Sequence, residues 1–202
     1  MLLDSDDSQL VLVDYQAKLM PAIFEAGLVT ANAVRLGQLA RLMQVPVWGT
    51  EQSPLKLGEN LPDIRALCDR TLAKTSFSAC ADGLVEWLRP VQEVRPPRGN
   101  ARSLPKHMQK PQVDEEQRST VIIAGCEAHV CLLQTALDLL EEEFDVCVVT
   151  DACSSRTERN RDAAFDRLAG AGAELVTTEM VAFEWLRGAD HPAFRQVQGL
   201  IK

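Results

Sequence analysis

No apolar run in the 202-residue sequence approaches the roughly 18–20 residues that a helix needs to cross a bilayer. The N-terminal stretch MLLDSDDSQL is acidic and lacks the apolar centre of a signal peptide. Basic charge is also scarce, because the formal net charge is -8, whereas nucleic-acid-binding proteins usually carry a broad basic surface. We therefore expect a cytoplasmic protein without a membrane partner and without a nucleic-acid partner.

Cysteine, in contrast, is well represented. The six residues are Cys68, Cys80, Cys126, Cys131, Cys147 and Cys153. An even number is compatible with disulfides, but dense disulfide frameworks belong to small secreted domains with little core. This chain is 46% hydrophobic and long enough to bury a substantial core, so we predict one domain over 1–202 with free thiols.

Short apolar, β-branched runs alternate with helical patterns along the chain. The runs predict strands over 10–15, 45–50, 71–77, 120–125, 145–151 and 173–178. Periodicity and capping signals predict helices over 22–43, 82–88, 132–144, 155–169 and 180–187. Strands that are apolar throughout are buried on both faces, so the alternation predicts an α/β protein, a three-layer α/β/α sandwich.

Two local signals refine this outline. Ser155 and Glu158 have the spacing of a capping box, which places the start of a helix at Ser155. The stretch from Pro90 to Arg118 interrupts the pattern, with five of the ten prolines and no acidic residue between Arg95 and Lys110. Loops this long in compact domains are usually lids or disordered segments. We interpret 90–118 as a Pro-rich basic insertion that either contacts a partner or has no role.

In parallel sheets covered by helices, ligands bind beyond the carboxyl ends of the strands. The rule singles out Asp14, 50–52, the Lys74 region, 125–131 and Asp151. Cys131 lies near the start of a helix, where the partial positive charge of the helix N-terminus lowers the pKa of a thiol. Asp14 and Lys74 would supply the proton acceptor and the positive neighbour that a thiolate nucleophile needs. Taken singly, each residue also has a purely structural interpretation.

A metal site is an alternative for the same turn, because Cys126, His129 and Cys131 are closely spaced soft ligands. A structural zinc site takes four ligands, however, and a tight turn would point these three side chains in different directions. The other histidines, His107 and His191, form no second ligand pair. We therefore predict no metal and no cofactor.

Several segments resemble the isochorismatase-like cysteine hydrolases. GCEAHVCLLQTALDLL and VVTDACSSR are similar to the strand, turn and helix of that family's active site. LVLVDYQ resembles its first strand with the catalytic aspartate, and LAKTSFSAC resembles its catalytic lysine segment. TEQSPLKLG and HPAFRQVQGLIK resemble the isochorismatase-domain-containing proteins and similar bacterial hydrolases. The similarity covers nearly the whole chain except 90–118.

The resemblance implies a mostly parallel six-stranded sheet and a triad of Asp14, Lys74 and Cys131. It also implies a cis peptide bond between Cys126 and Glu127, which would direct the amides of Glu127 and Cys131 at an oxyanion. A small-molecule substrate and a homo-oligomer follow from the same family likeness.

Side chains near the substrate are harder to assign. Gln16 matches a family glutamine close to the site, two residues after the aspartate. Among apolar residues, Phe77, Trp48 and Met20 are candidates for the walls of the pocket, although each is also an ordinary core residue.

Two departures from the superfamily narrow the reaction. Nicotinamidases of this superfamily hold a metal with a histidine-containing loop, but the corresponding stretch TEQSPLKLGEN has no histidine. True isochorismatases cleave a vinyl ether without needing a nucleophilic cysteine. Cys131 therefore favours metal-independent hydrolysis of a small amide or related C–N bond through a covalent thioester.

Two interpretations from other classes stay open. A catalytically idle protein of the same fold would act as an interaction module through 90–118. A receiver-like signalling domain would also place an aspartate and a lysine at strand ends, but it needs acids clustered around the phosphorylated aspartate. Asp4, Asp6 and Asp7 precede the first strand instead.

Overall fold

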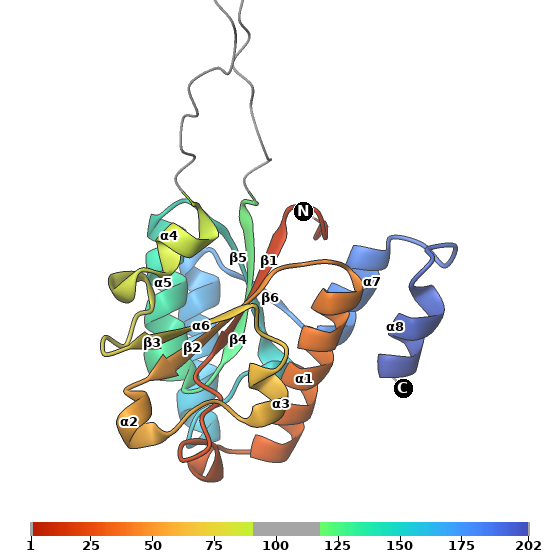
Figure 1. Ribbon diagram of the computed structural model, residues 1–202. Coiled ribbons are helices and arrows are strands. Elements are labelled where there is room, and N and C mark those ends of the chain that lie inside the picture. The colour runs from red at the N-terminus through yellow and green to blue at the C-terminus, as the bar shows by residue number, and fades with distance from the viewer. Residues whose placement is uncertain (1, 91–117, 202) are drawn as a thin grey trace, which may run out of the picture.

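The computed structural model describes residues 2–90 and 118–201. Six strands form one all-parallel sheet in the order β3-β2-β1-β4-β5-β6 (Figure 1). The strands are β1 (Ser8–Val13), β2 (Val47–Gln52), β3 (Arg70–Lys74), β4 (Thr120–Gly125), β5 (Asp145–Val149) and β6 (Glu174–Val176). The α/β class and the six-stranded sheet predicted from the sequence are confirmed.

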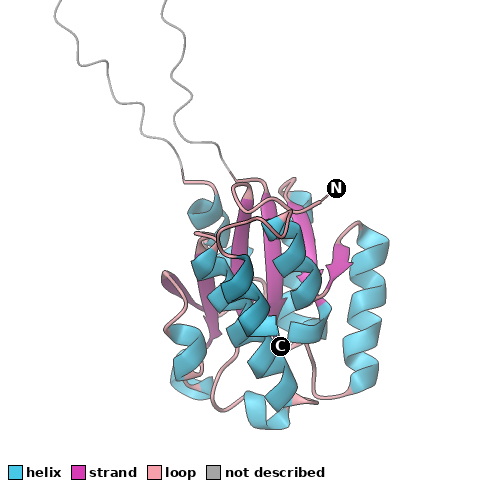
Figure 2. Cartoon of the chain, turned by 90° about the vertical axis from the view of Figure 1, so that its right-hand side faces the viewer, coloured by secondary structure: helices cyan, strands magenta, loops and turns pink. Residues whose placement is uncertain are grey.

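Helices cover both faces of the sheet. The α-helices are α1 (Ala26–Leu42), α2 (Pro54–Leu57), α3 (Pro62–Arg65), α4 (Leu84–Leu88), α5 (Leu133–Glu141), α6 (Glu158–Ala171), α7 (Thr178–Leu186) and α8 (Phe194–Ile201). Short 3-10 turns are η1 (Met20–Ala22), η2 (Cys80–Asp82) and η5 (Thr150–Ala152), and η4 (Ala128–Leu132) is a π-helical turn. Helices α1, α3, α7 and α8 lie on one face, and α4, α5 and α6 lie on the other (Figures 1 and 2). None of the described helices is long and apolar enough to span a membrane.

The two central strands explain why the layers form. Every residue of β1 and β4 is buried, and most of them are apolar, so each strand must be covered on both faces. At their carboxyl ends the two backbones come very close. A Cβ atom on Gly125 would lie 2.4 Å from the Val13 carbonyl oxygen, so only glycine fits there. This close approach brings the segments that follow β1 and β4 together.

The strand order places a crevice at the same point. From β1 the chain moves outward to β2 and β3, and from β4 it moves in the opposite direction to β5 and β6. The order reverses between β1 and β4, and open α/β sheets bind ligands beyond the carboxyl ends of the strands at such a reversal. The fold therefore favours a site formed by the residues that follow β1 and β4.

Several boundaries differ from those predicted. The side chain of Thr157, not Ser155, caps α6 by accepting the N–H of Asn160, because the buried Ser155 hydroxyl contacts a histidine ring instead. Strand β2 continues to Gln52, two residues beyond the prediction. The tail after His191 contains α8, whose buried Val197 helps it pack on α1 and α7.

Three further predictions concern the cysteines, the insertion at 90–118 and the number of domains. All six cysteines are free, as predicted. The predicted insertion at 90–118 lies outside the described residues except for its ends, Pro90 and Arg118. Arg118 donates to the carbonyls of Ser5 and Ser8, so this end lies at the amino edge of the sheet. The single-domain interpretation stays a prediction.

Candidate active site

Three side chains singled out from the sequence meet at the carboxyl edge of the sheet. Asp14 follows β1 directly, Lys74 is the last residue of β3, and Cys131 lies in η4 after β4. The long lysine side chain reaches past β2, and its Nζ lies 2.8 Å from Asp14 Oδ2, with both side chains fully buried. The Cys131 thiol lies close enough to both groups for their charges to act on its pKa.

The backbone of Asp14 is left-handed, with φ of 55°, a conformation that aspartate tolerates better than most residues. Its Oδ1 atom accepts a hydrogen bond of 2.7 Å from Thr50 Oγ1. Its Oδ2 atom faces the lysine ammonium but lies outside hydrogen-bonding geometry, and no described residue donates to it. One carboxylate oxygen is thus fixed, and the other is free to accept a proton.

The ammonium of Lys74 is surrounded by oxygen atoms. It donates to Gln52 Oε1 at 2.8 Å, to the Phe77 carbonyl at 3.0 Å and to the Ser76 carbonyl at 3.4 Å. Asp82 steadies the loop that carries these carbonyls by accepting the Ser76 N–H at 2.9 Å. A buried ammonium is costly unless it is paired and hydrogen-bonded, and here it is both.

Cys131 is only 6% exposed, and its thiol donates toward Gln52 Oε1 over 3.9 Å. Burial, together with the negative charge of Asp14, raises the pKa of the thiol from 9.0 to about 12, although the charge of Lys74 opposes the shift. The expectation that this thiol has a lowered pKa is therefore wrong, because burial and Asp14 outweigh the groups that favour the thiolate. The thiol is protonated near neutral pH, so a thiolate requires transfer of the proton to a neighbouring base.

The turn before Cys131 is tightly constrained. The peptide bond between Cys126 and Glu127 is cis. The Glu127 carbonyl accepts the N–H groups of Val130 at 3.0 Å and Leu132 at 3.3 Å. The Glu127 carboxylate forms an ion pair of 2.9 Å with Arg156 Nε. These contacts hold the segment that presents Cys131 from both its backbone and its side chains.

The metal alternative for this turn finds no support in the geometry. Cys126 is fully buried at the end of β4, and His129 Nδ1 lies 2.9 Å from Ser155 Oγ. Within residues 2–90 and 118–201, no three His, Cys, Asp or Glu side chains converge in a way that could hold a metal ion.

The four residues expected near the substrate lie in different places. Gln16 is fully buried, and both ends of its amide bind the backbone of Gln52, at 2.8 and 3.0 Å, so its contact with a substrate stays a prediction. Phe77 follows Lys74, its ring is half-exposed, and its proximity to substrate is likewise untested.

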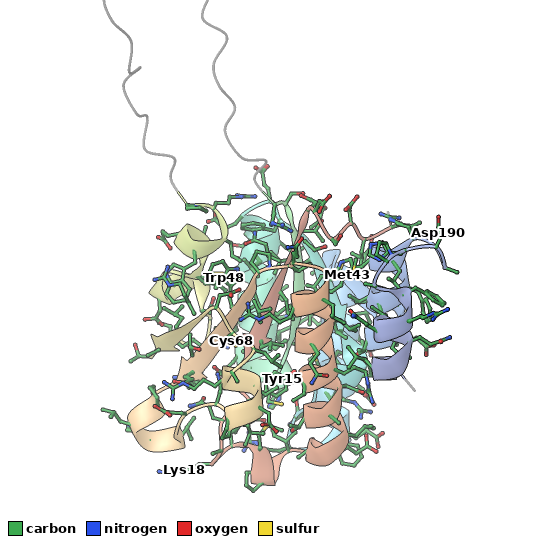
Figure 3. The ribbon with its side chains drawn as sticks, turned by 45° about the vertical axis from the view of Figure 1, so that its right-hand side comes forward. Tyr15, Lys18, Met43, Trp48, Cys68 and Asp190 are labelled. Carbon is green, nitrogen blue, oxygen red and sulfur yellow. The ribbon has the colours of Figure 1, made fainter. Side chains whose placement is uncertain are left out.

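Trp48 lies away from the carboxyl edge of the sheet, whereas a contact of Met20 with the substrate pocket stays a prediction. Trp48 is near the amino end of β2, where it donates to Gln9 and packs against Trp87. Figure 3 shows it well above Tyr15 and Lys18, which follow the carboxyl end of β1. Met20 is buried in the core. Sequence reasoning identified 50–52 as a candidate region but gave Thr50 and Gln52 no role. The alternation of a strand, which puts both side chains on one face, was the available signal.

The family follows from comparison with known proteins. The isochorismatase domain model matches residues 108–180. Isochorismatase domain-containing protein 2A of Mus musculus is 34% identical over 197 residues, which cover 98% of this chain and 84% of that protein. This chain belongs to the isochorismatase family.

Solved structures agree with this membership in the isochorismatase family. The MAR1 ribonuclease of Caenorhabditis elegans is 32% identical with a TM-score of 0.83, covering 100% of this chain and 92% of its own. YcaC of Pseudomonas aeruginosa, solved with hexane-2,5-diol and covalent acrylamide, is 25% identical with a TM-score of 0.80 and coverages of 98% and 90%. YcaC of Escherichia coli, described as an octameric hydrolase of unknown specificity, is 27% identical with a TM-score of 0.76 and coverages of 98% and 95%. The chain thus has an isochorismatase-like hydrolase fold.

Proposed function

We propose that this isochorismatase-family chain is a cysteine hydrolase that cleaves a small amide or related C–N bond through a thioester on Cys131, without a metal or cofactor. The observation that carries the proposal is the fully buried ion pair between Asp14 and Lys74 beside the Cys131 thiol. Burying two charges next to a thiol is expensive for a purely structural purpose. A nucleophile, a proton acceptor and a positive charge are the groups that covalent hydrolysis needs.

In the first step, Asp14 Oδ2 accepts the thiol proton as Cys131 Sγ attacks the carbonyl carbon of the substrate. The new C–S bond pushes the carbonyl electron pair onto oxygen and forms a tetrahedral oxyanion. Collapse of this intermediate breaks the C–N bond, and Asp14 returns the proton to the departing nitrogen. The Lys74 ammonium stabilises the negative charge on the carboxylate and on the developing thiolate.

In the second step, water hydrolyses the thioester. Asp14 removes a proton from water as the water oxygen attacks the thioester carbon. The C–S bond then breaks, the acid product leaves, and the proton returns to the Cys131 sulfur. The free Oδ2 atom of Asp14 serves as the proton acceptor in both half-reactions.

We assign stabilisation of the oxyanion to the amides of Glu127 and Cys131. Other amides of the same turn are engaged, because Ala128 donates to the Ser154 carbonyl at 2.8 Å, and Val130 donates to the Glu127 carbonyl. Backbone N–H groups at the start of a helix, next to the nucleophile, suit an oxyanion that forms on the carbonyl under attack.

A small amide is the preferred substrate class for two reasons. The Pseudomonas aeruginosa relative carries covalent acrylamide, which is itself a small amide. The Caenorhabditis elegans relative is named a ribonuclease, but the net charge of -8 on this chain disfavours a polyanionic substrate. The octameric Escherichia coli relative supports a homo-oligomer, which light scattering in solution would measure.

The test is a panel of small amides and ureides, with an RNA oligonucleotide included, assayed on wild type and Cys131→Ala. We expect the variant to lose activity on the hydrolysed amide by about 10³-fold or more, because no other group replaces the nucleophile. Cys68→Ala is the matched control, since Cys68 is a half-buried thiol away from the triad. Full turnover by Cys131→Ala, or cleavage of RNA alone, would show that the proposal is wrong.

The interaction-module alternative predicts the opposite pattern. Its segment is 90–118, of which 91–117 lie outside the described residues. If that alternative holds, no compound in the panel turns over, Cys131→Ala leaves the phenotype unchanged, and deletion of 91–117 abolishes it.

A further inference from the structure

Gln52, which is not part of the proposed triad, contacts both the lysine and the cysteine of that triad. Its Oε1 atom accepts from Lys74 Nζ at 2.8 Å and lies 3.9 Å from Cys131 Sγ. Its Nε2 atom donates to the Thr75 carbonyl at 2.8 Å and contacts Ser53 Oγ at 3.3 Å. Because these partners hold the nitrogen, the amide cannot flip, and its oxygen faces the ammonium and the thiol.

The backbone of Gln52 is held as firmly as its side chain. Gln16 Oε1 accepts the Gln52 N–H at 2.8 Å, and Gln16 Nε2 donates to the Gln52 carbonyl at 3.0 Å. Gln16 is itself fully buried and forms an isolated antiparallel bridge with Asn60. The two glutamines thus fix the end of β2 against the segment that follows Asp14.

The three N–H donors of Lys74 are shared among the oxygen atoms around it. An ammonium has three N–H donors, and three oxygens lie in hydrogen-bonding geometry to its nitrogen, namely Gln52 Oε1, the Phe77 carbonyl and the Ser76 carbonyl. Asp14 Oδ2 is close enough for charge pairing at 2.8 Å but receives no hydrogen bond from the described residues. The three neutral oxygens occupy the donors that would otherwise turn to the carboxylate.

We propose that Gln52 is a positioning residue that keeps the general base free: its side-chain oxygen takes one Lys74 N–H and orients the resting thiol, so that Asp14 Oδ2 stays unbonded. This inference rests on the proposed cysteine-hydrolase function. The thiol rotates about its Cβ–Sγ bond from Gln52 to Asp14 as the substrate arrives, and Asp14 then accepts the proton.

The sign of the effect on the thiol follows from the same contacts. Without the Gln52 oxygen, the thiol loses an acceptor for its proton, and Lys74 can donate to Asp14 or to the thiolate. Each change favours the thiolate, so the pKa of Cys131 falls. A carboxylate at position 52 instead adds a negative charge beside the sulfur, and the pKa of Cys131 rises.

Other charged groups near the thiol do not interfere with this prediction. Those that face it are Asp14 from the end of β1 and Lys74 from β3. Carboxylates on neighbouring elements have partners of their own. Glu127 pairs with Arg156, and Glu51 accepts the backbone N–H of Asn60. Asp82 accepts the N–H of Ser76, and Asp138 accepts the Ser78 hydroxyl.

The experiment measures alkylation of Cys131 by iodoacetamide as a function of pH, followed by peptide mass spectrometry, on Gln52→Met and Gln52→Glu. We expect the midpoint to move down by about one pH unit in Gln52→Met and up by a similar amount in Gln52→Glu. Turnover of the amide found in the panel should fall about tenfold or more in Gln52→Met although its thiolate is more abundant, because Asp14 is then a poorer base. Gln38→Met, at an exposed position on α1, is the control and should change neither quantity.

Thermal unfolding of each variant separates these shifts from loss of structure. If folded Gln52→Met and Gln52→Glu move the alkylation midpoint in the same direction, or not at all, Gln52 has only a packing role and the inference is overturned. Alkylation needs no substrate, so this outcome is independent of the proposed function. Failure of the proposed function would instead appear as full turnover by Cys131→Ala.

Discussion

Two aspartates, one at each edge of the sheet, have opposite surroundings. Asp7, at the amino edge, accepts three hydrogen bonds of 2.7–2.8 Å from the Ser119 N–H, the Ser119 hydroxyl and the Thr120 hydroxyl. Asp14, at the carboxyl edge, accepts one from Thr50, and its second oxygen receives none from the described residues. Asp7 is half-buried, whereas Asp14 is fully buried.

The difference distinguishes a structural carboxylate from one suited to proton transfer. Partial burial alone would raise the pKa of Asp7, but its hydrogen bonds and the charge of Arg118 bring it below its ordinary value. Those bonds join the start of β1 to the start of β4. The carboxylate of Asp14 keeps one oxygen open beside a thiol and is balanced by an ammonium rather than by hydroxyl groups.

The largest expected effect comes from removing the counter-charge of Asp14. Lys74→Met should lower the free energy of unfolding by about 3–5 kcal/mol, because it leaves a buried carboxylate uncompensated. Urea unfolding measures the loss. The double variant Asp14→Asn/Lys74→Met, which has neither charge, should recover much of the stability. If the single variant is as stable as wild type, the pair is not as buried as the structure shows.

The reactivity of Cys131 tests the carboxyl edge directly. Since burial and the charge of Asp14 raise the pKa of the thiol to about 12, its alkylation by iodoacetamide should be slow near neutral pH. The rate should then increase about tenfold per pH unit, in proportion to the thiolate. Asp14→Asn should shift the midpoint to lower pH, because it removes the charge that opposes the thiolate. A midpoint at or below 9.0 in wild type would contradict this description of the site.

A substitution at the amino edge of the sheet should change the stability of the protein but not its activity. Asp7→Asn should reduce the free energy of unfolding by about 1.5–3 kcal/mol, the range for hydrogen bonds to a charged group, without changing turnover. The pKa of Asp7 is lowered in the folded state, so its contribution is complete above the ordinary value of 3.8 and disappears as pH falls through the folded value. Denaturation of wild type and variant at pH 7 and pH 3 measures both. A loss of hydrolysis in Asp7→Asn would remove the contrast between the two edges.

The smallest effect is expected for an ion pair in water. Arg41 and Asp69 are 2.6 Å apart, but their side chains are 44% and 38% exposed. Arg41→Ala should change the free energy of unfolding by about 0.2–1 kcal/mol, and less at high salt. An effect as large as that of Lys74→Met would mean that burial is not what distinguishes the two pairs.

The parts of the fold that sequence predicts well are those with a single strong cause. Runs such as TVIIAG must be buried on both faces, and this requirement specifies β4 and its neighbours as parallel strands. Helix termini are harder to predict, because neighbouring residues of similar capping preference compete for the N-cap position. Ser155 and Thr157 are both acceptable N-caps by composition, and the contact between Ser155 and His129, which lie 26 residues apart, decides for Thr157.

The residues of the candidate site also differ in how far the sequence predicts them. Asp14, Lys74 and Cys131 are recognisable because each comes at or after the end of a strand, where a parallel sheet collects its polar groups. Gln52 also ends a strand, and the same rule singles out 50–52, but a glutamine there has no chemistry of its own that would distinguish it from a surface residue. Its role depends on Gln16 and on the adjacent residues Lys74 and Thr75, which come from two segments far from each other along the chain.

The sequence by itself determined the order of strands and helices, the family, and which aspartate, lysine and cysteine reach the carboxyl edge. These follow from apolar runs and from motifs that lie within one segment each. Only the tertiary structure decided that the Cys131 thiol is protonated at rest, that one oxygen of Asp14 is open, and that Gln52 faces both lysine and cysteine. Burial and charge–charge interactions set these properties, and both depend on the distances between segments that are far apart along the chain.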